Sequence, residues 1–200
     1  PYMLYEGSNK KDVVVSIIVI SAALIIYFKG YNLSSGVFIT SIAMTAFLIR
    51  EIGQRTVSRW MDAYVETKLS RKGTGVTLFI SLISAITSLP VIWLIPTINS
   101  FSQKKHEHWG KSVDAMWSKR EYWIASGGIT ALSAVSLTSL ALSQTQVTQA
   151  LTAYTLSQLV PLRDSIVEGD TDGAYILFHS GFTWLIFTGI NIVVITSASF

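Results

Sequence analysis

The sequence contains no cysteine among its 200 residues, and only 14% of those residues are charged. The absence of cysteine excludes disulfide bonds and thiolate metal ligands, and it leaves the cellular compartment open. A soluble domain carries about 25% charged residues, so the charge deficit argues against an ordinary soluble protein. The net charge of +3 is small, and the basic residues cluster beside apolar runs. This pattern favours the lipid bilayer as a partner and no nucleic acid.

Hydrophobic residues make up 50% of the chain and gather in long apolar runs. A helix needs about 20 consecutive apolar residues to cross a bilayer. The sequence therefore predicts an all-α, polytopic membrane helix bundle with about five to six membrane segments, folded as a single transmembrane domain over residues 1–200. The apolar runs are residues 13–27, 36–49, 77–98, 122–142, 150–162 and 175–197, and the second is expected to continue as an amphipathic helix through Trp60. A start at Pro1 rather than Met is compatible with a removed leader.

The third apolar run, residues 77–98, contains Pro90 and Pro96, which break or kink a helix. The segments on both sides of this run are rich in lysine and arginine, and both are typical of cytoplasmic loops. A complete span would place these two segments on opposite sides of the membrane. We therefore favour a re-entrant segment broken near Pro90. The alternative is a complete span in which one loop violates the positive-inside rule.

The fourth run, residues 122–142, is rich in glycine, alanine and serine, including Gly127 and Gly128. Small residues allow two helix backbones to approach closely in a membrane. We therefore expect this helix to lie centrally in the bundle.

The segment that closes the second run, residues 47–60, carries the outline of a zinc-protease motif. In His-Glu-x-x-His, two imidazoles one helical turn apart bind zinc and the glutamate between them activates water. Glu51 is present here, but Arg50 and Gln54 stand at the positions of the two histidines. A guanidinium group keeps its proton and a carboxamide is a poor zinc ligand. The segment therefore has the spacing of the motif without its ligands.

Three blocks in order resemble the site-two protease family of intramembrane zinc metalloproteases, in its archaeal form. Residues 47–64 resemble an apolar helix that ends in His-Glu-x-x-His-x-x-x-Ala-x-x-x-Gly. Residues 119–128 are similar to an Arg-Arg-Glu-x-x-Ile-Ala-x-x-Gly entry into the next helix. Residues 158–161, followed by 172–177, are similar to the Asn-x-x-Pro and Leu-Asp-Gly elements that supply the third zinc ligand. The order and spacing of the blocks fit the family over about residues 36–177.

The resemblance places the three zinc-ligand positions at Arg50, Gln54 and Asp172, and the general base at Glu51. A catalytic zinc needs three protein ligands and an open position, and one carboxylate cannot hold it. The resemblance therefore implies a degenerate, inactive member without catalytic residues, cofactor or metal. It also implies that Asp172 approaches Arg50, so that an ion pair fills the vacated zinc site. The alternative is that Arg50 snorkels at the membrane edge. Gln158 stands in the asparagine position, and an insertion after it indicates an altered pocket.

His106, His108 and His179 are the weak candidates for a metal site. The spacing of His106 and His108 suits a loop or strand site, with His179 or Asp114 as a third ligand. We favour a solvated interfacial loop for the first two histidines. For His179, in the middle of the last run, we favour a hydrogen-bonded interior position over one that lines a polar cavity.

These observations lead to competing functional hypotheses. The first is a pseudoprotease of the archaeal cytoplasmic membrane that binds or scaffolds other membrane segments. The second is an accessory subunit of a multi-subunit archaeal membrane complex, for example a membrane oxidase such as ammonia monooxygenase. In both, the partners are other membrane proteins or subunits. An active metalloenzyme built on the three histidines is less favoured. So is a transporter, because intramembrane charges are few and the two halves show no symmetry.

Overall fold

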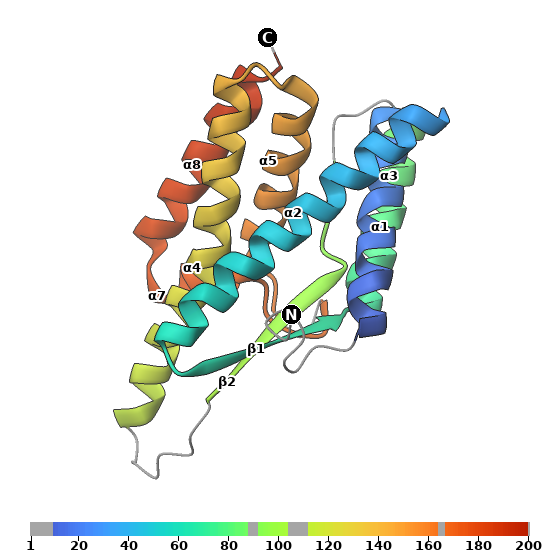
Figure 1. The fold of residues 1–200 in the computed structure, drawn as a ribbon. Coiled ribbons are helices and arrows are strands. Elements are labelled where there is room, and N and C mark those ends of the chain that lie inside the picture. The colour runs from blue at the N-terminus through green and yellow to red at the C-terminus, as the bar shows by residue number, and fades with distance from the viewer. Residues whose placement is uncertain (1–9, 88–91, 104–111, 164–166, 200) are drawn as a thin grey trace.

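A computed structural model of the chain describes residues 10–87, 92–103, 112–163 and 167–199. In order, its elements are α1 (Lys10–Phe28), α2 (Leu33–Trp60), β1 (Ala63–Leu69), α3 (Arg71–Thr87), β2 (Thr97–Gln103), α4 (Ser112–Ala141), α5 (Thr145–Leu159), α7 (Asp172–His179) and α8 (Gly181–Ser197). In Figure 1, α2 runs diagonally between the α1–α3 pair and a bundle of α4, α5, α7 and α8. The predicted, mainly helical bundle is confirmed, but the two-stranded sheet was not expected.

Three helices are long and apolar enough to cross a membrane: Lys10–Phe28, Leu33–Trp60 and Ser118–Ala141. This finding fits an integral membrane protein, but it does not reach the predicted five to six segments. The shortfall lies in α3, α5, α7 and α8, which are 17, 15, 8 and 17 residues long. Each is shorter than the roughly 20 residues that a bilayer requires.

The last apolar run is broken, and the prediction of one continuous segment over residues 175–197 was wrong. α7 ends at His179 and α8 begins at Gly181, with extended backbone at Ser180 between them. The Ser180 hydroxyl accepts a hydrogen bond from the Thr183 amide at 3.3 Å, so it caps α8. A side-chain cap in the middle of an apolar run therefore starts a new helix.

The third apolar run leaves the sheet and returns to it. β1 and β2 pair antiparallel with Leu69 opposite Thr97, so the ends of the intervening segment meet. The Ser70 amide donates to the Pro96 carbonyl at 2.9 Å, and the Ile95 amide donates to the Thr77 hydroxyl at 3.0 Å. The returning residues 92–96 thus lie against the first turns of α3. This is the path that a re-entrant segment requires, while Pro90 lies outside the described residues.

α4 occupies the centre of the bundle, in contact with α2, α5, α7 and α8. It crosses α2 at a pair of glycines. A β-carbon on Gly53 would lie 2.6 Å from the carbonyl oxygen of Gly127, so neither position has room for a side chain. The prediction that small residues make this helix central is confirmed. The close crossing brings the end of α2 into the interior of the molecule.

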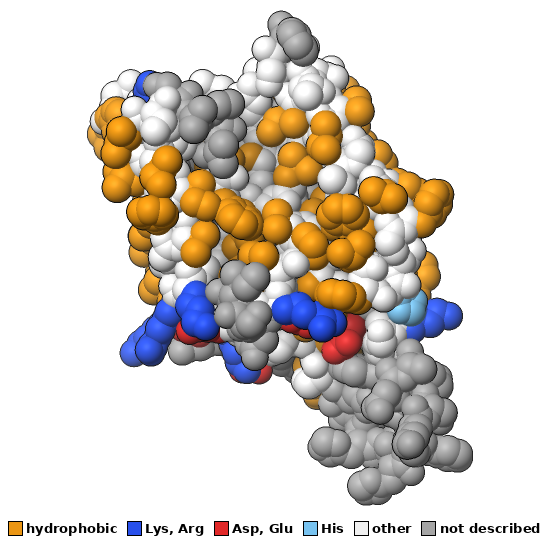
Figure 2. All heavy atoms as spheres, turned by 180° about the vertical axis from the view of Figure 1, so that it is seen from behind, with side chains coloured by type: hydrophobic (Ala, Val, Ile, Leu, Met, Phe, Trp, Pro, Cys, Tyr) orange, Lys and Arg blue, Asp and Glu red, His pale blue; other side chains and the backbone are white. Residues whose placement is uncertain are grey.

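Charge is distributed unevenly between the two ends of the molecule, named here as Figure 1 draws them. The lower end holds the first residues of α1, α3 and α4, and the upper end holds the α1–α2 and α4–α5 connections. Among the described residues, Lys29 in the α1–α2 connection is the one charged residue at the upper end. Figure 2 shows hydrophobic side chains over the middle of the surface and charged ones along its lower edge. The described basic residues on both sides of the third run thus lie at one end.

Candidate functional site

Several polar residues near the end of α2 face the protein interior. Arg50 and Gln54 are fully buried, and Glu51 is only 3% exposed. Ile52 and Trp60 on the same helix are 53% and 79% exposed. The amphipathic pattern was therefore read correctly as a helix, but its polar face points inward. The alternative in which Arg50 snorkels at the membrane edge is wrong.

Arg50 forms a two-point ion pair with Asp172, 122 residues further along the chain. The Arg50 Nε donates to Asp172 Oδ2 at 2.7 Å, and Nη2 donates to Oδ1 at 3.0 Å. Both side chains are 1% exposed. Parallel charge-assisted hydrogen bonds of this kind fix orientation as well as distance. The predicted pairing of Arg50 with Asp172 is confirmed.

Asp172 is placed by the structure around the start of α7. It is the first residue of that helix, where a negative charge is favourable. The preceding Thr171 donates its hydroxyl hydrogen to the Val160 carbonyl at 2.6 Å and accepts from the Leu162 amide at 3.0 Å. A β-carbon on Gly173 would collide with the Leu159 backbone, so glycine permits this contact between α7 and α5.

Glu51 is held by donors from three elements. Its Oε2 accepts from the Thr67 hydroxyl at 2.7 Å and from Arg55 Nη2 at 3.2 Å. Its Oε1 accepts from Asn99 Nδ2 at 2.9 Å and lies 3.8 Å from Arg50 Nη1. Two arginines and two carboxylates therefore balance within one buried polar cluster. Each charge has an opposite partner, as burial requires.

Gln54 completes this cluster on the side of α4. Its carbonyl oxygen accepts from the Asn99 amide, which also donates to Glu51. A β-carbon on Gly128 would lie 2.7 Å from Gln54 Cγ and 3.2 Å from Arg50 Cγ. Glycine in α4 therefore makes room for two long polar side chains at the helix crossing.

Gln158, from the third resembling block, has a different role. Its Nε2 donates to the Leu94 carbonyl at 2.7 Å, and the neighbouring Ser157 hydroxyl accepts from the Leu94 amide at 3.0 Å. Together they hold both polar backbone groups of one residue in the returning segment. This satisfies irregular backbone inside the protein, where unpaired groups are costly.

Strand residues contribute to the cluster, and they were not identified from the sequence. Thr67 lies in β1, whereas Thr97 and Asn99 lie in β2, and all three are at most 1% exposed. The available signal was alternation: in β1, residues Ala63, Val65 and Thr67 are buried and those between them are more exposed. Alternation with period two is the pattern of a strand with one buried face.

The donor set does not fit a zinc ion. Both oxygens of Asp172 accept from Arg50, and both oxygens of Glu51 have donors. Arg50 and Gln54 offer no suitable ligand atoms at the two remaining positions. Within the described ranges, no group of three or more histidines and carboxylates is arranged to hold a metal ion.

The histidine candidates do not come together in the described structure. His106 and His108 lie outside the described residues. His179 is exposed at the end of α7, with its ring 4.6 Å from that of Tyr122. The prediction of an interior His179 was wrong, because the apolar run breaks at Ser180 and leaves the histidine at a helix end.

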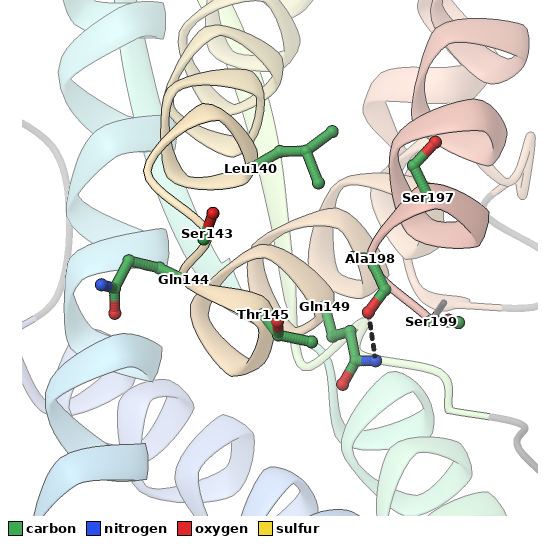
Figure 3. Close-up of a pocket in the computed structure, with 8 residues that line it drawn as sticks. All are labelled: Leu140, Ser143, Gln144, Thr145, Gln149, Ser197, Ala198 and Ser199. Carbon is green, nitrogen blue, oxygen red and sulfur yellow. Dashed lines mark hydrogen bonds between the residues drawn. The ribbon is translucent and has the colours of Figure 1, made fainter.

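A separate hollow lies at the upper end, far along the chain from the polar cluster. Figure 3 shows it between the α4–α5 turn and the end of α8, lined mostly by polar, uncharged side chains together with Leu140 and Ala198. Its volume is about 330 Å³, and Gln149 Nε2 donates across it to the Ala198 carbonyl at 3.2 Å. None of the described residues that line it is titratable.

Comparison with known proteins did not assign a family. No protein-family model, curated protein or solved structure matches this chain.

Proposed function

We propose that this chain is a pseudoprotease of the archaeal cytoplasmic membrane, related to the site-two proteases, which binds or scaffolds other membrane segments. The observation that carries the proposal is the buried Arg50–Asp172 pair. It joins two of the positions at which the resemblance places zinc ligands. A permanent cation there opposes binding of a second cation by Coulomb repulsion.

The architecture around the polar cluster supports a role in binding membrane segments. An apolar groove of about 270 Å³ lies between α1, the returning segment, α5 and α8. Tyr27, Trp93, Leu156 and Ile195 are among the residues that line it. Small, concave apolar surfaces of this kind suit side chains of a helix that packs from the bilayer.

Binding of membrane segments is tested by purifying the tagged chain from its native membrane. We expect Leu156→Trp, which fills the groove, to lose co-purifying membrane proteins. Leu185→Trp is the matched control, because Leu185 is 62% exposed on α8 and outside the groove. A constant set of subunits, unchanged by Leu156→Trp, would instead favour the accessory-subunit role. Cleavage of a bilayer-embedded peptide by the purified chain would contradict the proposal.

The topology proposed here places the lower end in the cytoplasm, with the third run re-entrant. The clustering of basic residues at that end supports this orientation by the positive-inside rule. Because the chain has no cysteine, single cysteines can be labelled without background. We expect Tyr64→Cys and Ser102→Cys to react with an impermeant maleimide from the same side, and Gln144→Cys from the other. Labelling of the first two from opposite sides would show a complete span.

A further inference from the structure

α3 presents a continuous apolar face to its surroundings and a polar face to the protein. Phe79 and Ile86 are 63% and 74% exposed, whereas Thr77 and Ser81 are at most 1% exposed. In a helix surrounded by water the arrangement would be the reverse. The exposed face of α3 is therefore suited to an apolar environment.

The same face ends in two basic residues at the lower end. Arg71 and Lys72 are the first two residues of α3, and both are exposed. Lys72 lies seven residues before Phe79 and fourteen before Ile86, so the three share one stripe along the helix. The positive charge is thus aligned with the apolar surface above it.

Two carboxylates near this end of α3 accept hydrogen bonds from backbone amides. Glu168 accepts a hydrogen bond from the Arg71 backbone amide at 2.7 Å, and Asp12 accepts from the Leu69 amide at 3.5 Å. α1 packs beside α3 and adds exposed Lys11, with exposed Val15 one turn above it. The corner formed by α1 and α3 therefore carries three exposed basic residues, Lys11, Arg71 and Lys72, beside the exposed carboxylate of Glu168. Figure 2 shows basic side chains at this edge, directly below the hydrophobic surface.

Gly75 leaves the stripe without a side chain one turn above Lys72. A β-carbon at Gly75 would meet nothing within 4 Å, so the surface there is open. From Gly75 to Ile86 the helix rises about 16 Å at 1.5 Å per residue. One leaflet of hydrocarbon is about 15 Å thick, half of a 30 Å core. The apolar part of the stripe thus matches the length of one acyl chain.

We propose that α3 binds an anionic phospholipid of the cytoplasmic leaflet, with its phosphate at Arg71 and Lys72 and an acyl chain along Gly75, Phe79 and Ile86. This site rests on the proposed membrane location and orientation, but not on the pseudoprotease role. It does not use the polar cluster. Its failure would leave the Arg50–Asp172 pair and the groove unaffected.

The test is lipid binding by the full chain in neutral detergent, measured by native mass spectrometry. The probes are dioleoyl phosphatidylglycerol, dioleoyl phosphatidylcholine and inorganic phosphate. We expect phosphatidylglycerol to bind best and to weaken in high salt, because the phosphate contact is exposed. The double variant Arg71→Gln/Lys72→Gln should bind it roughly thirtyfold more weakly, since each basic residue near a membrane surface contributes about fivefold.

Two controls separate this site from a general charge effect. Lys29→Gln removes the basic residue at the upper end and should leave binding unchanged. Arg71→Lys retains the charge and should retain most of the affinity. The proposal is overturned if the double variant binds phosphatidylglycerol like the natural chain, if phosphatidylcholine binds equally well, or if Lys29→Gln has the same effect. Binding of inorganic phosphate as tight as that of the lipid would also contradict the role of the acyl chain.

Discussion

Replacing Arg50 with methionine leaves the Asp172 carboxylate buried without its partner. Removing one half of a buried ion pair costs about 3–5 kcal/mol, because the remaining charge is uncompensated. Arg50→Met should lie near the upper limit, since both oxygens of Asp172 lose their donors. Asp172→Leu should cost less, because Arg50 keeps Glu51 at 3.8 Å. The structure thus predicts unequal costs for the two halves of the pair.

The double variant Arg50→Met/Asp172→Leu should recover most of the lost stability. Buried ion pairs replaced by apolar residues of similar volume are often neutral or more stable by about 1–4 kcal/mol. The free energy of unfolding is measured by denaturant titration in detergent, and the four proteins form a double-mutant cycle. For a chain of this size, each kcal/mol corresponds to about 2–4 °C in melting temperature.

The matched control is the exposed pair of Glu66 and Lys68, whose charged atoms lie 3.0 Å apart at side-chain exposures of 41% and 60%. Exposed pairs contribute about 0–1 kcal/mol, so neither Glu66→Gln nor Lys68→Met should change stability by more than that. If the double variant at Arg50 and Asp172 is as destabilised as the sum of its single variants, the two side chains do not interact and the site described here is wrong.

Three further predictions concern the same region. Arg50→His/Gln54→His should bind zinc in equimolar amount by metal analysis, because two histidines and Asp172 provide three ligands. The control Arg50→His/Gln54→Ala should not bind zinc. Equal zinc in both variants would refute the proposal that these three positions correspond to zinc-ligand positions. Glu51→Gln should lower the free energy of unfolding by about 2–4 kcal/mol, because Arg55 loses its buried carboxylate partner. A change in this free energy below about 1 kcal/mol would mean that the Glu51 carboxylate is solvated. Gly127→Val should prevent the close crossing with α2 and lower the melting temperature, whereas Gly189→Val, at an open position on α8, should leave it within a few degrees.

Several features followed from the order of residue types along the chain. Apolar runs predict helices, and proline in the third run predicted its interruption. The spacing of Arg50, Glu51 and Gln54 predicted one helical face, since residues four apart align in a helix. The resemblance then connected that face with Asp172 across a long stretch of sequence. The predicted pairing of Arg50 with Asp172 assumed only that a chain with these blocks in this order has the fold of the family.

Other features depended on contacts that the chain makes with itself. Thr67 and Asn99 lie in strands, although the segments beside the third run were expected to be cytoplasmic loops. Two short strands stabilise each other only when they are paired, and pairing depends on the tertiary structure. His179 was misplaced because a single serine cap at Ser180 divides an apolar run.

The sequence by itself determined that this chain is mainly helical, apolar and able to place a cation beside a carboxylate. Only the tertiary structure decided that, near the end of α2, Arg50, Glu51 and Gln54 point inward while Ile52 and Trp60 point outward. Periodicity gives the angle between the two faces of a helix but not the direction in which either points. That direction depends on what surrounds the helix. The sheet and α7 provide hydrogen-bonding partners on one side, and on the other side the helix is exposed.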